Sequence, residues 1–290
     1  MNIALLNFIE EIMNIGASST GDNFDATVID KLQKNLPGAT FIPTTRWCST
    51  DKYSIFKEHN RLTQQYDFDF TKLPPLVDNG KPLSLMVVDK PNGSQKWPDM
   101  MVVFEGIGLP IEIKSSKTDN ITWNSGTPKK NGLYIFNCYG KSRTTCFLGQ
   151  HADPHDEVSI IKTIAAKAKD FVMEERRNHD GLVHWDFYLR NMFPSNQTFF
   201  ENEALKIRME STNNTIDTLV EKLDTATSEQ QYTKLSSKLD AAKEKYQGYH
   251  KAYHRIRDTR ITMETETQEY IKGLPWDSSQ TTKFDNMETP

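Results

Sequence analysis

Residues 97–117 read WPDMMVVFEGIGLPIEIKSSK and hold the pattern that decides the fold. Two apolar runs flank a glycine-containing turn at residues 106–108. Apolar runs of this length, bounded by turn residues, predict a hairpin of two strands at 99–105 and 109–115. Charged residues alternate with apolar ones along the second strand, which is typical of a strand with two different faces.

The second strand brings Glu112 and Lys114 to one face of the predicted hairpin. Residues two apart on a strand share a face, so Ile111 and Ile113 point to the other side. Asp99, at the start of the first strand, can join Glu112 across the hairpin. Two converging carboxylates form a hard-oxygen site suited to Mg²⁺, and a lysine beside such a metal suits phosphodiester hydrolysis. A surface hairpin with a solvated Glu–Lys pair would show the same pattern, so this alternative stays open.

This run resembles the PD-(D/E)XK nuclease superfamily, whose signature is Pro-Asp, a variable spacer, then Asp or Glu, any residue, and Lys. The resemblance implies a Mg²⁺-dependent phosphodiesterase with one or two ions per active site. It implies that Asp99 and Glu112 are metal ligands and that Lys114 orients or helps to deprotonate the attacking water. These three residues are the candidate catalytic residues.

Residues 19–32, STGDNFDATVIDKL, predict a helix with apolar residues at four-residue spacing. Many restriction endonucleases of this superfamily carry a Gly-x-x-Phe-Glu pattern on the helix before the catalytic sheet. Gly21, Phe24 and Asp25 are similar to that pattern, with Asp in place of Glu, and the resemblance implies a third metal ligand at Asp25. The alternative is that Asp25 only complements the positive end of the helix dipole.

The composition indicates a globular chain that does not coat nucleic acid nonspecifically. The chain has 290 residues, a formal net charge of −4 and no apolar run of membrane-spanning length. We expect a soluble, intracellular protein in the cytoplasm with no membrane partner. Cys48, Cys138 and Cys146 are odd in number and lack C-x-x-C spacing, which predicts buried free thiols and no zinc site.

The region around the motif is locally basic. From Lys96 to Gln150 there are seven basic and four acidic residues, a net charge of +3. Polyanion binding needs such a positive surface, because phosphate contacts dominate the affinity. The loop at 115–132, SSKTDNITWNSGTPKKNG, is polar and follows the motif directly. We predict DNA contacts here from six residues: Lys117, Trp123, Asn124, Ser125, Lys129 and Lys130. Loops of this composition also occur without a function.

The order of the predicted elements favours an α/β fold. A helical layer runs to about Asn35, and a long helix is predicted at 156–178. Strands are predicted at 83–89, 99–105, 109–115, 132–138 and 144–148. We expect a restriction-endonuclease-like core over residues 1–195, with a mixed central sheet flanked by helices.

The chain changes character after Pro194. Apolar residues from Leu205 onward follow heptad spacing in two segments, which predicts two long helices that form an antiparallel hairpin or pair with a second subunit. Ser228 and Gln231 make a capping box after the break at 224–228. We assign residues 196–275 to this helical hairpin, for dimerisation or for embracing DNA, and 276–290 to a polar tail.

The histidine pairs offer a rival metal site. His151 and His155, like His250 and His254, are four residues apart, a spacing that places two ligands on one helix face. Neither pair has an evident third ligand, so we expect structural or surface histidines.

The resemblance implies a type II restriction enzyme, a homodimer that cuts double-stranded DNA at a specific sequence and leaves 5′-phosphate and 3′-hydroxyl ends. Two-fold symmetry of the protein would match a palindromic site. The same core occurs in junction resolvases and in repair or phage nucleases. A non-cutting nucleic-acid-binding scaffold on the same fold is the alternative from another class.

Overall fold

The computed structural model describes residues 1–16, 21–43, 75–78, 80–91, 97–123, 127–152, 155–182, 193–194 and 198–276. The chain forms two compact units. The sheet unit comprises Met1–Gln197 and Met263–Pro290, and the hairpin unit comprises Thr198–Thr262.

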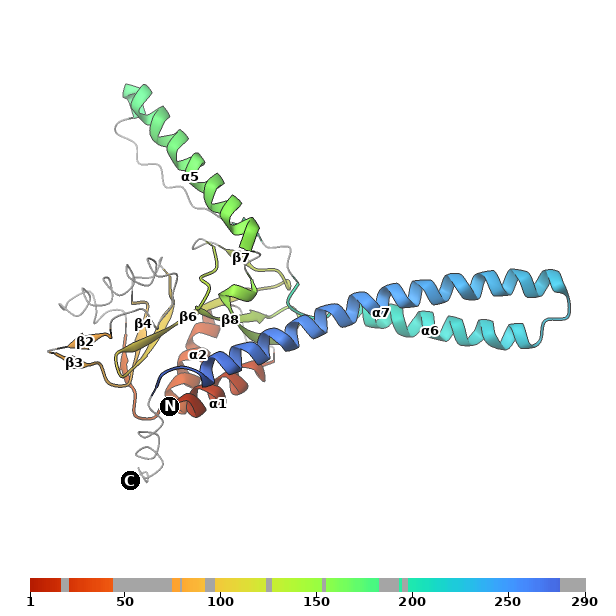
Figure 1. The fold of residues 1–290 in the computed structure, drawn as a ribbon, viewed down its shortest axis with the longest axis horizontal. Helices are drawn as coiled ribbons and strands as arrows, with labels where there is room; N and C mark the ends of the chain where they lie inside the picture. Colours follow the sequence, from red (N-terminus) through yellow and green to blue (C-terminus); the bar gives the residue numbers. More distant parts are fainter. Residues whose placement is uncertain are drawn as a thin grey trace. The chain divides into compact units, whose positions relative to one another are not determined.

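A six-stranded mixed sheet forms the centre of the sheet unit (Figure 1). Its strands, in spatial order, are β1 (Thr40–Ile42), β4 (Met86–Asp89), β5 (Met100–Phe104), β6 (Ile107–Ser116), β8 (Leu133–Cys138) and β9 (Arg143–Leu148). The pairs β1–β4 and β6–β8 are parallel and the other three pairs are antiparallel. Two small antiparallel pairs join β2 (Val77–Asp78) to β3 (Lys81–Pro82) and β7 (Thr122–Trp123) to β10 (Phe193–Pro194). The predicted α/β class with a mixed sheet is confirmed.

Strand β5 is apolar on both faces, as expected for a strand that is covered on both sides. All residues of β5 and of β8 are buried. The predicted β5–β6 hairpin is present, and its turn contains Gly106 with φ of 77°. This left-handed conformation suits glycine, and an added Cβ would lie 2.9 Å from the carbonyl oxygen of Leu76.

Two helices, α1 (Asn2–Met13) and α2 (Gly21–Asn35), pack on one face of the sheet. Their apolar residues recur at helical spacing and meet alternate residues of the strands, and together they form the main core. Its members include Leu5, Phe8, Phe24, Val28, Leu32, Met100, Val102, Ile111 and Ile113. A smaller apolar cluster on the opposite face contains Leu83, Met86, Val88, Met101 and Val103.

The end of the last helix, α7 (Glu229–Lys272), belongs to the sheet unit. Ile271, Leu274 and Trp276 join the main core, and the Asn2 side-chain amide donates a hydrogen bond of 2.9 Å to the carbonyl oxygen of Lys272. The boundary between the units therefore differs from the predicted hairpin range of 196–275, because these apolar residues are buried against the sheet. Of the predicted tail, only Trp276 lies within the described residues.

The remaining described elements of the sheet unit are short 3₁₀ turns and one long helix. The turns are Gly149–His151 and Asp180–Leu182. The long helix α5 (His155–Asn178) matches the predicted range of 156–178, and it exposes Ile160, Ile164 and Phe171.

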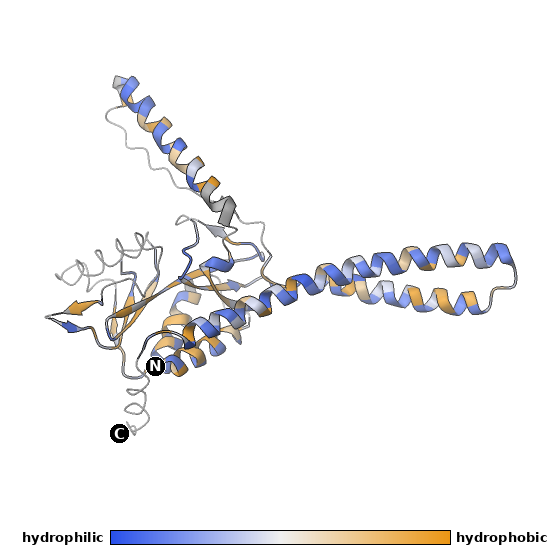
Figure 2. Cartoon of the chain, in the orientation of Figure 1, coloured by the Kyte–Doolittle hydropathy of each residue, from blue (hydrophilic) through white to orange (hydrophobic). Residues whose placement is uncertain are grey.

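In the hairpin unit, α6 (Glu203–Asp224) and the first part of α7 run side by side in opposite directions (Figure 1). The Arg208 guanidinium lies 6.0 Å from the centroid of the Tyr249 ring, which joins the two helices. The predicted break is confirmed, and the Ser228 hydroxyl accepts a 3.2 Å hydrogen bond from the backbone N–H of Gln231 as an N-cap. Polar colour dominates both helices in Figure 2, and no residue of α6 is buried.

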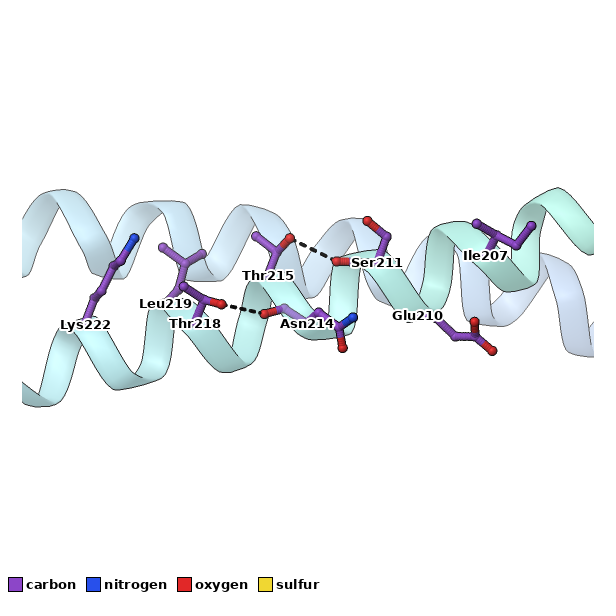
Figure 3. A pocket seen from close by; sticks show the side chains of 8 residues that line it. All are labelled: Ile207, Glu210, Ser211, Asn214, Thr215, Thr218, Leu219 and Lys222. Atoms are coloured by element: carbon purple, nitrogen blue, oxygen red, sulfur yellow. Dashed lines mark hydrogen bonds between the residues drawn. The ribbon is translucent and has the colours of Figure 1, made fainter.

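A shallow depression lies along one face of α6 (Figure 3). The Thr215 hydroxyl donates to the carbonyl oxygen of Ser211, and the Thr218 hydroxyl donates to that of Asn214. These hydroxyl groups are thus bonded to their own helix, and the charged residues that line the depression, Glu210 and Lys222, are twelve residues apart on α6. No described helix combines the length and the apolar composition that crossing a bilayer requires.

Candidate active site

The sheet register places Asp99 opposite Glu112. Met100 on β5 pairs with Ile111 on β6 in an antiparallel ladder, and one further residue along each strand gives the pair Asp99 and Glu112. Residues opposite each other in a ladder share a face, with Cβ atoms about 5 Å apart. The backbone N–H of Ile113 donates a 2.8 Å hydrogen bond to Oδ2 of Asp99, which fixes this carboxylate against β6.

Lys114 completes the group from the same strand as Glu112. Its Nζ lies 2.5 Å from Oε1 of Glu112. The Glu112 side chain is 3% exposed and that of Lys114 is 12% exposed, so this ion pair is largely removed from water. The predicted grouping of Asp99, Glu112 and Lys114 is therefore present in the fold, and the alternative of a solvated surface pair does not match this burial.

The electrostatics of the two carboxylates follow from their burial. Loss of water raises the pKa of Glu112 to about 7; the Lys114 ammonium opposes this rise and the Asp99 carboxylate adds to it. Burial also raises the pKa of Asp99, against the Ile113 N–H and Lys114, which lower it. Both shifts show that negative charge is costly at this point in the sheet, so a cation bound between the carboxylates would be strongly stabilising.

The donor set fits Mg²⁺. This ion is usually held by one or two carboxylates, with waters and substrate phosphate oxygens completing the coordination. Asp99 and Glu112 supply the two carboxylates. The described part of the chain holds no cluster of three or more His, Cys, Asp or Glu residues arranged for a metal.

Asp25 lies in the N-terminal part of α2 and is half-buried. Its neighbour Phe24 is fully buried in the main core, and α2 contacts β6, the strand that carries Glu112 and Lys114. The helix packs on the face of β6 that carries Ile111 and Ile113, which is opposite to the face of Glu112 and Lys114. Asp25, Asp99 and Glu112 are all described, and no three acidic residues of the described chain are grouped so as to hold a metal. The structure therefore does not bring Asp25 to the two other carboxylates as a third ligand.

Two neighbours of the carboxylates have no signal in the sequence. Tyr134 on β8 pairs with Glu112 in the parallel register, and it is buried. Lys90 follows β4, and its backbone N–H donates a 2.7 Å hydrogen bond to the carbonyl oxygen of Asp99. Lys90 directly after β4, Asp99 directly before β5, and Glu112 and Tyr134 on β6 and β8 therefore form one row across the sheet. Only the strand register reveals this row, because its members are distant in sequence.

The segment with Lys129 and Lys130 is held beside this row. The backbone N–H of Lys129 donates a 2.8 Å hydrogen bond to the Tyr134 hydroxyl. Gly149 approaches so closely that an added Cβ would lie 2.0 Å from the carbonyl oxygen of Lys129. Lys130 is exposed and Lys129 is half-buried, so both predicted DNA contacts lie on a backbone that is fixed near the carboxylates.

The other predicted DNA contacts have different positions. Lys117 follows β6 and is exposed. Trp123 is 5% exposed, and its ring lies edge-on to Tyr134 with centroids 5.3 Å apart, so its place here is in the packing around the row. Asn124 and Ser125 lie outside the described residues.

The histidines have structural surroundings. His151 binds Glu266 through Nε2 at 2.7 Å and accepts the Leu148 N–H through Nδ1, which confirms a structural role. His155 is the first residue of α5. On α7 the rings of His250 and His254 are tilted by 43° to each other, with centroids 4.1 Å apart.

Two of the three thiols are free and buried, as predicted. They are Cys138 and Cys146, and burial raises the pKa of both. Cys48 lies outside the described residues.

Comparison of the chain with protein-family models, with curated proteins and with solved structures gives no match. The functional assignment of this chain therefore rests on the geometry of the row.

Proposed function

We propose that this chain is a Mg²⁺-dependent endonuclease of the PD-(D/E)XK kind, a type II restriction enzyme that cuts double-stranded DNA at a specific sequence. One observation carries the proposal. Asp99 lies opposite Glu112, and Lys114 contacts Glu112 at 2.5 Å, in a site where burial raises the pKa of both carboxyl groups. Such perturbed groups are typical of functional sites.

Each residue of the group has a defined task in this reaction. Asp99 and Glu112 would hold Mg²⁺, which would stabilise negative charge on the phosphate and on the leaving oxygen. Lys114 holds its ammonium at the edge of the carboxylate pair, where it can orient the attacking water and stabilise the hydroxide formed from it. Attack at phosphorus with departure of the 3′ oxygen gives a 5′-phosphate and a 3′-hydroxyl.

Binding of DNA is assigned to the lysines around the row. Lys117 and Lys130 are exposed, and Lys129 is anchored next to Tyr134. A homodimer is part of the proposal, because a two-fold protein matches a palindromic site. The hairpin unit is the candidate for dimerisation or for embracing DNA.

The test is incubation of the purified protein with long double-stranded DNA, with Mg²⁺ or with EDTA, followed by gel electrophoresis. The variant is Lys114→Ala, and the control is Lys34→Ala. Lys34 also pairs with a glutamate, Glu11 at 2.9 Å, but it is 63% exposed and lies on α2. Discrete fragments that need Mg²⁺ and Lys114, and that persist in the control, are the expected result.

Three other outcomes of this experiment would change the proposal. A smear of fragments that also needs Mg²⁺ and Lys114 would indicate a nonspecific or repair nuclease instead of a sequence-specific one. Intact DNA on several unrelated substrates, together with Mg²⁺ binding measured by calorimetry, would favour the non-cutting scaffold. Equal cleavage by Lys114→Ala would contradict the proposed site.

A further inference from the structure

Lys90 extends the β4–β5 ladder to the carboxylates. Asp89 pairs with Met100, so one further residue on each strand places Lys90 opposite Asp99. The 2.7 Å hydrogen bond from the Lys90 N–H to the Asp99 carbonyl oxygen maintains the pairing at this point. Lys90 has φ of 44°, a left-handed conformation that non-glycine residues adopt infrequently and that often marks functional positions.

The Lys90 side chain is half-buried and its charge acts on the Asp99 carboxyl group. On the other side of the row, Lys114 forms a direct ion pair with Glu112. The charges of two lysines therefore act on the two carboxylates. Strands β4 and β6 are two strand spacings apart, roughly 10 Å. The two amines would therefore contact different parts of a bound substrate.

The formal charges of the site and of the reactants give a reason for a second amine, that of Lys90. Asp99, Glu112 and one Mg²⁺ would be neutral together. The two lysine amines and the Asp89 carboxylate, which also acts on Asp99, would then leave one formal positive charge. Hydroxide attack on a phosphodiester brings together two negative charges, one from each reactant. One amine at the water and one at a phosphate oxygen would match this distribution.

We propose that Lys90 is a second substrate cation of the site and binds a phosphate oxygen of the DNA strand near the bond that is cut. This inference rests on the proposed function and assigns a position that the signature motif does not include. Lys114 then serves the water, and Lys90 holds the backbone in register with the metal ligands.

The test measures the affinity of three variants for DNA as a function of salt concentration. EDTA is present so that the DNA is bound without being cut. Lys90→Asn removes the charge, and asparagine tolerates a left-handed φ. Lys90→Arg keeps the charge. Lys81→Ala is the control, because Lys81 is an exposed lysine on the short strand β3.

Loss of one phosphate contact reduces the slope of log affinity against log salt by about 0.9. We expect this change for Lys90→Asn, with affinity reduced roughly tenfold or more and cleavage reduced by a raised KM. We expect the wild-type slope for Lys90→Arg and for the control. A merely structural lysine would change thermal stability and leave the slope unaltered.

The outcomes separate the two claims. If the wild-type protein cuts DNA and Lys90→Asn keeps its slope and its KM, the assignment of Lys90 is overturned and the proposed function stands. If the wild-type protein neither cuts nor binds DNA, the proposed function fails and this inference fails with it. If Lys90→Asn does not fold, Lys90→Gln gives the same slope test with a longer side chain.

Discussion

The two units each contain a Glu–Lys pair, and the two pairs differ in their surroundings. Glu112 and Lys114 in the sheet unit are 3% and 12% exposed and 2.5 Å apart. Glu203 and Lys206 in the hairpin unit are 61% and 50% exposed and 3.8 Å apart. Water screens the exposed pair, which is worth little to stability. The same residue types therefore differ in their electrostatics, because water is largely removed from the pair in the sheet and not from the pair in the hairpin.

The largest difference between the units should appear in cleavage. Asp99→Asn removes one of the two carboxylates proposed to hold Mg²⁺, whose stabilisation of the transition state is worth several kcal/mol. We expect kcat/KM to fall by about 10³-fold or more. Asp217→Asn, at an exposed aspartate of α6, should leave cleavage unchanged. Timed digestion of one DNA substrate measures both variants, and equal loss in both would remove the distinction between the units.

The next largest difference between the units should appear in the free energy of unfolding that is lost when an apolar side chain is truncated. Phe8 in α1 is fully buried, whereas Val220 in α6 is 41% exposed. We expect Phe8→Ala to lower the free energy of unfolding by about 3–5 kcal/mol and Val220→Ala by less than about 0.5 kcal/mol. Urea titration followed by circular dichroism measures both. A similar cost at the two positions would show that α6 has a buried face in solution.

The sequence predicts those elements of each unit whose pattern lies within a short stretch of the chain. Alternation in LPIEIK and the glycine turn before it identify β5, β6 and the shared face of Glu112 and Lys114. Heptad spacing and the polar break identify the two long helices. Each of these signals lies within one or two adjacent elements, so no knowledge of distant pairing is needed.

The sequence does not predict contacts that depend on distant pairing. Tyr134 reaches Glu112 only through the parallel β6–β8 register, and Lys90 reaches Asp99 only through β4–β5. The heptad pattern of α7 likewise gives no sign that Ile271 returns to the core of the sheet unit. The polar composition around Trp123 suggests exposure, yet this ring packs against Tyr134.

A third contrast concerns pH in the absence of Mg²⁺. Burial raises the pKa of Glu112 from 4.5 to about 7, so the folded state keeps a proton that the unfolded chain has lost in this range. The stabilisation is fully present below about pH 4.5 and is lost as pH rises through 7, a change on the order of 3 kcal/mol. The raised pKa of Asp99 acts with the same sign.

Thermal unfolding at pH 5 and pH 8, with and without Mg²⁺, measures this contrast. The metal-free sheet unit should be less stable at pH 8, and Mg²⁺ should stabilise it more at pH 8 than at pH 5, because the carboxylates must be ionised to bind. Glu112→Gln should reduce the dependence of stability on pH, whereas Glu203→Gln in the hairpin unit should leave this dependence unchanged. A metal-free protein that gains stability between pH 5 and pH 8 would contradict the assignment.

The smallest effect should be confined to the hairpin unit, where no buried layer covers α6 and local helix signals carry more of the stability. Ser228 caps the start of α7 by accepting the Gln231 N–H at 3.2 Å. Ser228→Ala removes this acceptor and should cost about 1 kcal/mol. Ser237→Ala makes the same substitution at an exposed position inside α7, where alanine is the better helix former, so it should be neutral or slightly stabilising.

Amide hydrogen exchange resolves the effect of the cap in the two units separately. Faster exchange in α6 and the start of α7, with α1 and β6 unchanged, is expected for Ser228→Ala and not for Ser237→Ala. If exchange also accelerates in the sheet unit, the two units unfold as one, and the burial that raises the pKa of Glu112 then depends on the hairpin as well as on the sheet.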